Sequence, residues 1–268
     1  MSAVPQPRDN RTVRFLDRDF ARFSVQNNLY CVPIDVDDEY RQKELNRIFR
    51  DVLQDRVVLA PNFPPPGVEE PQVLECGVGK GAWIEDLLEG YEHCEVTGVD
   101  IYFGQGGEDD EDDEDDEDDE GDEERDEEAV QEFTKKIWNL NAPFRDDRSS
   151  SRIGRERFDL VNSRLLMDGI NTDRWPSYVN DLYQVLKPGG WLQMVELELK
   201  FQSDNVSASL GQDVRSNVQS HIEAVSLWPF AGALPPAQGR MTVAQYQALL
   251  LGAQTQLQDD SLRLYYDL

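Results

Sequence analysis

The sequence Val73-Leu-Glu-Cys-Gly-Val-Gly-Lys-Gly-Ala-Trp83 decides the fold of this chain. Its first residues have the apolar character of a buried strand, and the glycines at 77, 79 and 81 predict a turn that leads into a helix. A second predicted strand, Glu95–Val99, follows and ends at Asp100. A strand, a glycine turn and a helix, followed by a strand that ends in an acid, form the arrangement that a nucleoside cofactor requires.

Each part of this arrangement has a physical role beside a cofactor. Glycines let the backbone approach a ligand closely, and the first turn of the following helix directs free N–H groups and a partial positive charge toward the turn. A methionine carboxylate can bind there, while the Asp100 carboxylate can accept hydrogen bonds from two ribose hydroxyls. The NAD fingerprint needs its third glycine one residue beyond Gly81. The sequence therefore favours S-adenosyl-L-methionine (SAM), and the later Leu186-Lys-Pro-Gly-Gly-Trp191 turn is also more typical of methyltransferases.

Strands and helices alternate along the chain, which predicts an α/β fold with a parallel sheet and a ligand site at the carboxyl ends of its strands. The predicted strands are Gln72–Cys76, Glu95–Val99, Lys136–Trp138, Arg157–Asn162, Trp191–Phe201 and Ser261–Leu268. Helices are expected from Asp35 or Asp37 to Gln54, from Trp83 to Gly90, from Asp173 to Leu186, from Val206 to Trp228 and from Thr242 to Leu251. The first of these is either a plain packing helix or a wall of the cofactor cleft.

The candidate cofactor-binding residues lie in the glycine turn and at the ends of the predicted strands: Glu75, Gly77, Gly79, Gly81, Asp100, Ile101, Asn139 and Asn162. A sulfonium methyl group is already activated, so catalysis consists mainly of aligning an oxygen, nitrogen or sulfur nucleophile with it, and a base is optional. Candidates for the acceptor side are Arg164, Asp168, Glu196 and His221. Arg164 can hold an acidic substrate group or form a salt bridge with Asp168. His221 lies on a predicted apolar helix. It is either a structural residue or a catalytic base.

Composition excludes several classes of function. The net charge of −28 is concentrated in Glu108–Glu128, which has 19 acidic residues and one arginine, and this leaves −10 for the rest of the chain. There is no basic stripe for nucleic acid and no apolar run of about 18 residues for membrane insertion. The scattered Cys31, Cys76 and Cys94 indicate neither a metal site nor a disulfide framework, so we expect a reducing compartment.

The same patterns predict the domain organisation. Residues 1–28 are polar and are expected to form a flexible arm that docks partly through Phe15, Phe20 and Phe23. Residues 29–268 form the catalytic domain, interrupted at about 106–128 by an acidic insertion that should be disordered because it repels itself. The alternative for this insertion is a docking arm for a basic partner.

Several motifs in a fixed order resemble the LaeA-like family of fungal class I SAM-dependent methyltransferases, which includes the VapB/VipC-type enzymes. The motifs span about residues 28–200: Tyr30-x-x-Pro33, Asp37-Asp-Glu-Tyr-Arg41, the glycine turn with Trp83, Gly98-Val-Asp100 with Gln105, Phe158-Asp-Leu-Val-x-x-Arg164, Asp173-x-Trp175, Leu186-Lys-Pro-Gly-Gly190 and Glu196. The resemblance implies a SAM cofactor and a Rossmann-like, mostly parallel seven-stranded sheet with helices on both faces. It also implies a cytoplasmic or nuclear location, a role in secondary metabolism or development, and in some members a protein partner or a second methyltransferase subunit.

The sequence departs from the family pattern at four places. Lys80 stands where small residues are usual, and Asn139 replaces the usual acid beside the adenine. The acidic insertion replaces a short link after Gln105, and the family normally continues beyond Leu268, so the last strand is expected to be missing. We expect a methyltransferase that acts on an O, N or S atom of a small molecule or protein. The alternative is a regulatory protein-binding module that keeps the fold with little or no turnover.

Overall fold

The computed structural model describes residues 4–8, 10–15, 17–104, 133–144 and 153–196, together with isolated positions after residue 201. The acidic insertion, His221 and nearly all of the two helices predicted after residue 205 lie outside these described residues. In the described part of the chain, no helix combines the length and the apolar character that crossing a membrane would need.

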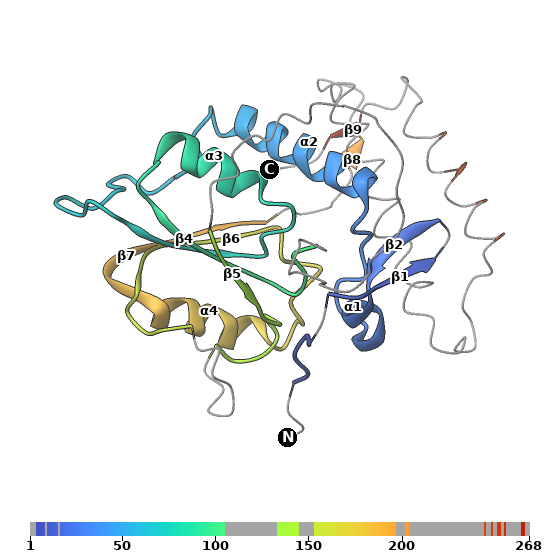
Figure 1. The fold of residues 1–268 in the computed structure, drawn as a ribbon. Coiled ribbons are helices and arrows are strands. Elements are labelled where there is room, and N and C mark those ends of the chain that lie inside the picture. The colour runs from blue at the N-terminus through green and yellow to red at the C-terminus, as the bar shows by residue number, and fades with distance from the viewer. Residues whose placement is uncertain are drawn as a thin grey trace, which may run out of the picture.

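A five-stranded parallel sheet forms the centre of the described structure, which confirms the predicted α/β class (Figure 1). Its spatial order is β5-β4-β3-β6-β7. The strands are β3 (Gln72–Cys76), β4 (Glu95–Asp100), β5 (Thr134–Ile137), β6 (Phe158–Arg164) and β7 (Leu186–Val195). The strand order reverses beside β3, because β4 and β5 extend to one side and β6 and β7 to the other. A crevice at the carboxyl ends is expected at such a reversal.

Helices cover both faces of this sheet, as predicted (Figure 1). Helix α3 (Ala82–Gly90) buries Trp83, Ile84, Leu87 and Leu88 on one face. Helix α4 (Trp175–Val185) buries Tyr178 and Leu182 on the other. Because both faces are covered, consecutive residues of the two central strands are apolar and fully buried: Val73 and Leu74 in β3, Leu160 and Val161 in β6.

The segment expected to form a loose arm contains regular structure instead. Strands β1 (Thr12–Phe15) and β2 (Arg18–Ala21) form an antiparallel hairpin, and α1 (Arg22–Asn27) follows directly. Asp17 takes a left-handed φ of 59°, which a short polar side chain tolerates in a tight turn. The sequence did not show this hairpin because its strands lack a strong apolar alternation. Of the three rings expected to dock this segment, Phe20 is fully buried, whereas Phe15 and Phe23 are half-buried.

Helix α2 (Val36–Val52) begins where the sequence predicted. Its N-cap is Asp35, whose Oδ1 accepts a hydrogen bond of 3.2 Å from the amide of Asp38. Leu45, Ile48 and Phe49 form its buried apolar face. Figure 1 places α2 beside α3 on the same side of the sheet, with its amino-terminal end toward the hairpin.

Strand β7 differs from its prediction. It starts at Leu186, whereas the sequence predicted a turn at 187–190 and a strand from Trp191. Leu186 pairs with Phe158 and Trp191 pairs with Leu160, so Lys187–Gly190 bulge opposite Asp159 alone. The Lys187 ammonium stabilises this bulge by donating to Asp159 Oδ2 over 2.7 Å. A short antiparallel pair, β8 (Gln202–Ser203) and β9 (Leu264–Tyr265), lies outside the main sheet, and β9 falls within the strand predicted at 261–268.

Candidate functional site

A pocket opens at the carboxyl ends of β3, β4 and β6, where the strand order reverses. Most of the predicted site residues line it: Glu75, Gly77, Gly79, Asp100, Ile101, Asn139, Arg164 and Glu196. Gly81 is the N-cap of α3, and Asn162 is fully buried on β6; neither belongs to the lining. His221 lies outside the described residues.

The three glycines of the turn all have left-handed φ angles, of 76° at Gly77, 56° at Gly79 and 91° at Gly81. This conformation is unfavourable for residues with a Cβ. At two of these glycines, a neighbouring side chain also occupies the position that a Cβ would take. A Cβ on Gly77 would lie 2.3 Å from Leu166 Cδ2, and a Cβ on Gly79 would lie 2.3 Å from Gln42 Oε1, whereas Gly81 faces open space.

Asp100 closes β4 and is bound to the glycine turn. Its Oδ2 accepts a hydrogen bond of 2.9 Å from the amide of Gly79, and its Oδ1 accepts from the amides of Ile101 and Tyr102 over 2.6 and 3.2 Å. Burial raises the pKa of Asp100 to about 6, and the backbone donors oppose this rise. A carboxylate can accept about four hydrogen bonds, and Oδ2, which accepts from Gly79, is the less occupied of the two Asp100 oxygens.

Glu75 lines the pocket and interacts with two residues of the neighbouring strand β6, of which Arg164 lines the pocket and Asn162 does not. The Glu75 side chain is buried, and its Oε2 accepts a hydrogen bond of 2.7 Å from Asn162 Nδ2. Burial raises the pKa of Glu75 to about 8, while the charge of Arg164 acts in the opposite direction. Burial also lowers the pKa of Arg164, whose guanidinium lies 5.5 Å from the centre of the Phe49 ring.

The acceptor-side candidates lie around the loop that follows β6. The Glu196 carboxylate accepts hydrogen bonds of 3.0 Å from the amides of Leu166 and Met167, and burial raises its pKa. Its contacts therefore anchor this loop. Asp168 also lines the pocket. Of the two alternatives considered for Arg164, the salt bridge to Asp168 is not formed, since no ion pair of 4 Å or less joins the two residues within the described ranges.

Asn139 lines another part of the pocket, two residues after the end of β5. Its Oδ1 accepts from both nitrogens of Asn141, over 3.0 Å from the amide and 3.3 Å from Nδ2. Its Nδ2 donates to the carbonyl of Pro5 over 3.0 Å, and its backbone amide donates to Gln6 Oε1 over 2.9 Å. The amino-terminal segment therefore contacts this part of the pocket.

The residues predicted for the site did not include any from α2 or from the segment that leads into this helix. Tyr30 lines the pocket, together with four residues from one face of α2: Arg41, Gln42, Leu45 and Asn46. Of the two roles considered for this helix, the wall of the cleft is correct. The available signal was the Tyr30-x-x-Pro33 motif with the acidic, arginine-containing helix after it.

Lys80 is oriented by the same helix. Its ammonium lies 3.6 Å from Glu39 Oε2, and its backbone amide donates to Gln42 Oε1 over 3.1 Å. The Lys80 side chain, which is unusual at this position of the turn, therefore pairs with an acidic residue of α2.

Comparison with known proteins agrees with this architecture. A family model described as "Methyltransferase domain" matches residues 38–230. The "Secondary metabolism regulator LAE1" of Cochliobolus heterostrophus is 23% identical over 205 residues, which cover 76% of this chain and 57% of the relative. The "Methyltransferase grgD" of a Penicillium species is 21% identical over 199 residues, which cover 74% of this chain and 62% of the relative. The "Secondary metabolism regulator laeA" of Aspergillus fumigatus is 22% identical over 68% of this chain and 40% of the relative.

These similarities confirm the predicted resemblance to the LaeA-like proteins, and the chain spans between 40% and 62% of the length of these relatives. Similar solved structures include coclaurine N-methyltransferase bound to N-methylheliamine and SAH, at 14% identity. That match covers 81% of this chain and 48% of the other, with a TM-score of 0.35. Human N-acetylserotonin methyltransferase in complex with SAM is 17% identical over 80% of this chain and 51% of the other, with a TM-score of 0.32.

Proposed function

This chain belongs to the methyltransferase-domain family, and from that premise we propose that it transfers the methyl group of SAM to an oxygen, nitrogen or sulfur atom of a small molecule or a protein. The observation that supports this most directly is the joining of the glycine turn to Asp100 at the reversal of strand order. A Cβ on Gly77 or Gly79 would displace the side chain of Leu166 or Gln42, so the backbone of the turn stays open to close approach, and the Asp100 carboxylate lies directly beside it. These features suit a nucleoside that carries an amino-acid tail.

The roles we propose follow the pocket from one end to the other. Asp100 accepts one ribose hydroxyl through Oδ2, and Ile101 and Asn139 form the wall beside the adenine. Glu75, supported by Asn162, provides a carboxyl group for the methionine ammonium, and Gly77–Gly81 give the tail close access to the backbone. SAM supplies an electrophilic methyl group when bound, so the protein mainly has to orient the acceptor and exclude water.

On the acceptor side we assign the orienting role to Arg164. Its guanidinium is a planar fork of N–H donors, lies against Phe49 and lines the pocket. These properties favour an acceptor with an acidic group. Glu196 holds the loop that contains Leu166 and Met167, so it positions this wall. A role in fungal secondary metabolism, a cytoplasmic or nuclear location and a protein partner follow, as proposals, from the resemblance to the regulators named above.

A second candidate function is a regulatory module that keeps the fold with little turnover. Asn139 favours it, because its amide oxygen already accepts two hydrogen bonds and its amide nitrogen donates to Pro5. An adenine amine that approached this side chain would have to displace one of these internal contacts. The pocket would then remain a structural feature while another surface engages a partner.

Isothermal titration of the purified full chain with SAM tests the proposal. We expect binding by the native protein, a loss of about tenfold or more in affinity for Asp100→Ala, and native affinity for the exposed control Asp173→Ala. An absence of binding heat in the folded native protein would reject the methyltransferase assignment. Binding of SAM without formation of S-adenosylhomocysteine (SAH) in the presence of cell extract would favour the regulatory module.

A further inference from the structure

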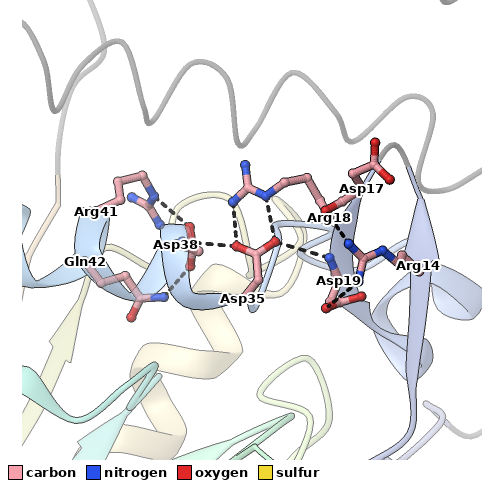
Figure 2. A network of polar contacts seen from close by, with 8 residues as sticks. All are labelled: Arg14, Asp17, Arg18, Asp19, Asp35, Asp38, Arg41 and Gln42. Carbon is pink, nitrogen blue, oxygen red and sulfur yellow. Dashed lines mark hydrogen bonds and ion pairs between the residues drawn. The ribbon is translucent and has the colours of Figure 1, made fainter.

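A continuous polar network connects the amino-terminal hairpin to the glycine turn, and Gln42 is its last member. Figure 2 shows the network from Arg18 through Asp35 and Asp38 to Gln42. We propose that Gln42 is a positioning residue: it ties α2 to the glycine turn and so holds the turn in the shape that binds the cofactor. This inference rests on the proposed SAM site, but it concerns residues that the cofactor motif does not include.

The orientation of the Gln42 amide follows from its neighbours. Its Nε2 donates to Asp38 Oδ2 over 2.6 Å, and a carboxylate without a proton can only accept. The amide oxygen must therefore face the other way. There it accepts a hydrogen bond of 3.1 Å from the backbone amide of Lys80. Asp38 thus determines which end of Gln42 meets the glycine turn.

The fit between Gln42 and the turn is close as well as polar. A Cβ on Gly79 would lie only 2.3 Å from Gln42 Oε1. The glycine is therefore needed for the approach of α2 in addition to its left-handed φ of 56°. Gln42 itself lines the pocket, so a shift of the turn or of this side chain would change the surface that the cofactor meets.

The support behind Gln42 is buried and fully engaged. Asp38 is 1% exposed, and its second oxygen accepts from Arg41 Nε over 2.7 Å. The Asp38 amide binds the N-cap Asp35, which in turn receives two hydrogen bonds, of 2.6 and 2.7 Å, from Arg18. Since each member has a defined donor or acceptor role, the network can transmit the position of the hairpin to the turn.

The central test is an exchange of hydrogen-bonding roles between Asp38 and Gln42. Asp38→Asn leaves a single oxygen for two donors, Gln42 Nε2 and Arg41 Nε, and Gln42→Glu places a second carboxylate opposite Asp38, so each single change creates a mismatch in the network. The double change Asp38→Asn/Gln42→Glu restores a donor–acceptor pair, keeps the total charge, and leaves an acceptor for Lys80. We expect each single variant to weaken SAH binding about tenfold and the double variant to recover to within about threefold of native.

A second measurement observes the contact itself and needs no cofactor. Gln42→Leu removes both hydrogen bonds at similar volume, so the Lys80 amide should exchange with deuterium faster than in the native protein. Glu44→Gln is the matched control on the same helix, because Glu44 pairs with Arg47 instead of the turn. It should change neither the exchange nor SAH binding. Thermal unfolding of each variant shows that it is folded.

The outcomes separate the two proposals. If native protein binds SAH but Gln42→Leu binds equally well and exchanges Lys80 at the native rate, Gln42 has no positioning role. The same conclusion follows if the double variant combines the losses of the two single variants without recovery. If native protein does not bind SAH, the proposed cofactor site is wrong, and the Lys80 exchange still decides whether Gln42 positions the turn.

Discussion

Asn162 Nδ2 donates a hydrogen bond of 2.7 Å to Glu75 Oε2 across the centre of the sheet. The two residues are direct partners in the register of the parallel strands β6 and β3. Both side chains are almost completely withdrawn from solvent, so this contact defines how this acid of the pocket lining is held. An amide is a suitable partner because it can donate to Glu75 whether the acid is ionised or neutral.

The raised pKa of Glu75 predicts that stability falls as pH increases. Its folded pKa is about 8 against an ordinary value of 4.5, so between these values the folded state retains a proton that the unfolded state has released. Between these two pKa values, the free energy of unfolding should fall by up to about 1.4 kcal/mol per pH unit. Urea unfolding at pH 6 and pH 8 measures it, and Asp100, with a raised pKa of about 6, contributes only at the lower end of this window.

Glu75→Gln provides the control for this titration. The substitution keeps an oxygen for Asn162 Nδ2 and removes the ionisable group. The fall in the free energy of unfolding between pH 6 and pH 8 should therefore be smaller in the variant. Parallel pH dependences in the two proteins would show that another group causes the effect.

Asp100→Asn should weaken SAM binding and change its pH dependence. Because burial raises the pKa of Asp100 to about 6, acidification from pH 7.5 to 5.5 protonates much of this acid and removes an acceptor for the ribose. Native affinity should fall across this range, whereas the variant should bind about tenfold more weakly at pH 7.5 and vary less. Titration calorimetry at both pH values measures this. Equal pH profiles would exclude Asp100 as the titrating group.

Comparison of Gly77→Ala with Gly81→Ala should separate the effect of backbone strain from that of steric overlap with a neighbouring side chain. Both positions have left-handed φ angles, so each alanine should destabilise the protein by about 1–2 kcal/mol. Only the Cβ at 77 would meet Leu166, a residue of the pocket wall, while the Cβ at 81 meets nothing within 4 Å. SAM affinity should therefore fall further in Gly77→Ala than in Gly81→Ala, although their midpoints of thermal unfolding are lowered similarly. The reverse order of affinities would contradict this account.

Arg174→Met should destabilise the fold by about 3 kcal/mol, because it leaves buried acceptors without donors. Arg174 is 8% exposed, donates to the carbonyls of Leu140 and Ala142 over 3.1 and 3.0 Å, and pairs with Asp181. These bonds hold the segment that contains Asn139. Chemical unfolding measures the loss, and Arg155→Met, at an exposed arginine, is the comparison that should change stability little. Similar losses in both variants would argue against this role for Arg174.

The sequence predicted the parts of the site whose geometry is local. The spacing of Gly77, Gly79 and Gly81 after an apolar strand already implied a turn and a helix, because these conformations depend on neighbouring residues. The sequence also limited the cap of α2 to Asp35 or Asp37, and the structure identifies Asp35, whose carboxylate meets an amide three residues later. The parallel sheet followed from the alternation of strands and helices, since such connections restrict the topology.

The hairpin and the bulge lacked a clear local signal. Strands β1 and β2 contain many charged residues, so their pairing depends on burial of Phe20 and on the ion pair between Arg18 and Asp35. The bulge at Lys187–Gly190 depends on Asp159, which belongs to another strand. Neither partner can be identified from the residues next to it in the sequence.

By itself, the sequence determined the fold class and a cofactor turn with its following acid, because periodicity and backbone conformation act over short distances. Only the tertiary structure decided that Gln42 of α2 meets the amide of Lys80, that Asn139 binds the segment of Pro5 and Gln6, and that Asn162 supports Glu75. Each of these contacts joins residues that are 38 to 134 positions apart. Such pairs form only when the packing of the sheet and its helices brings their hydrogen-bonding groups together.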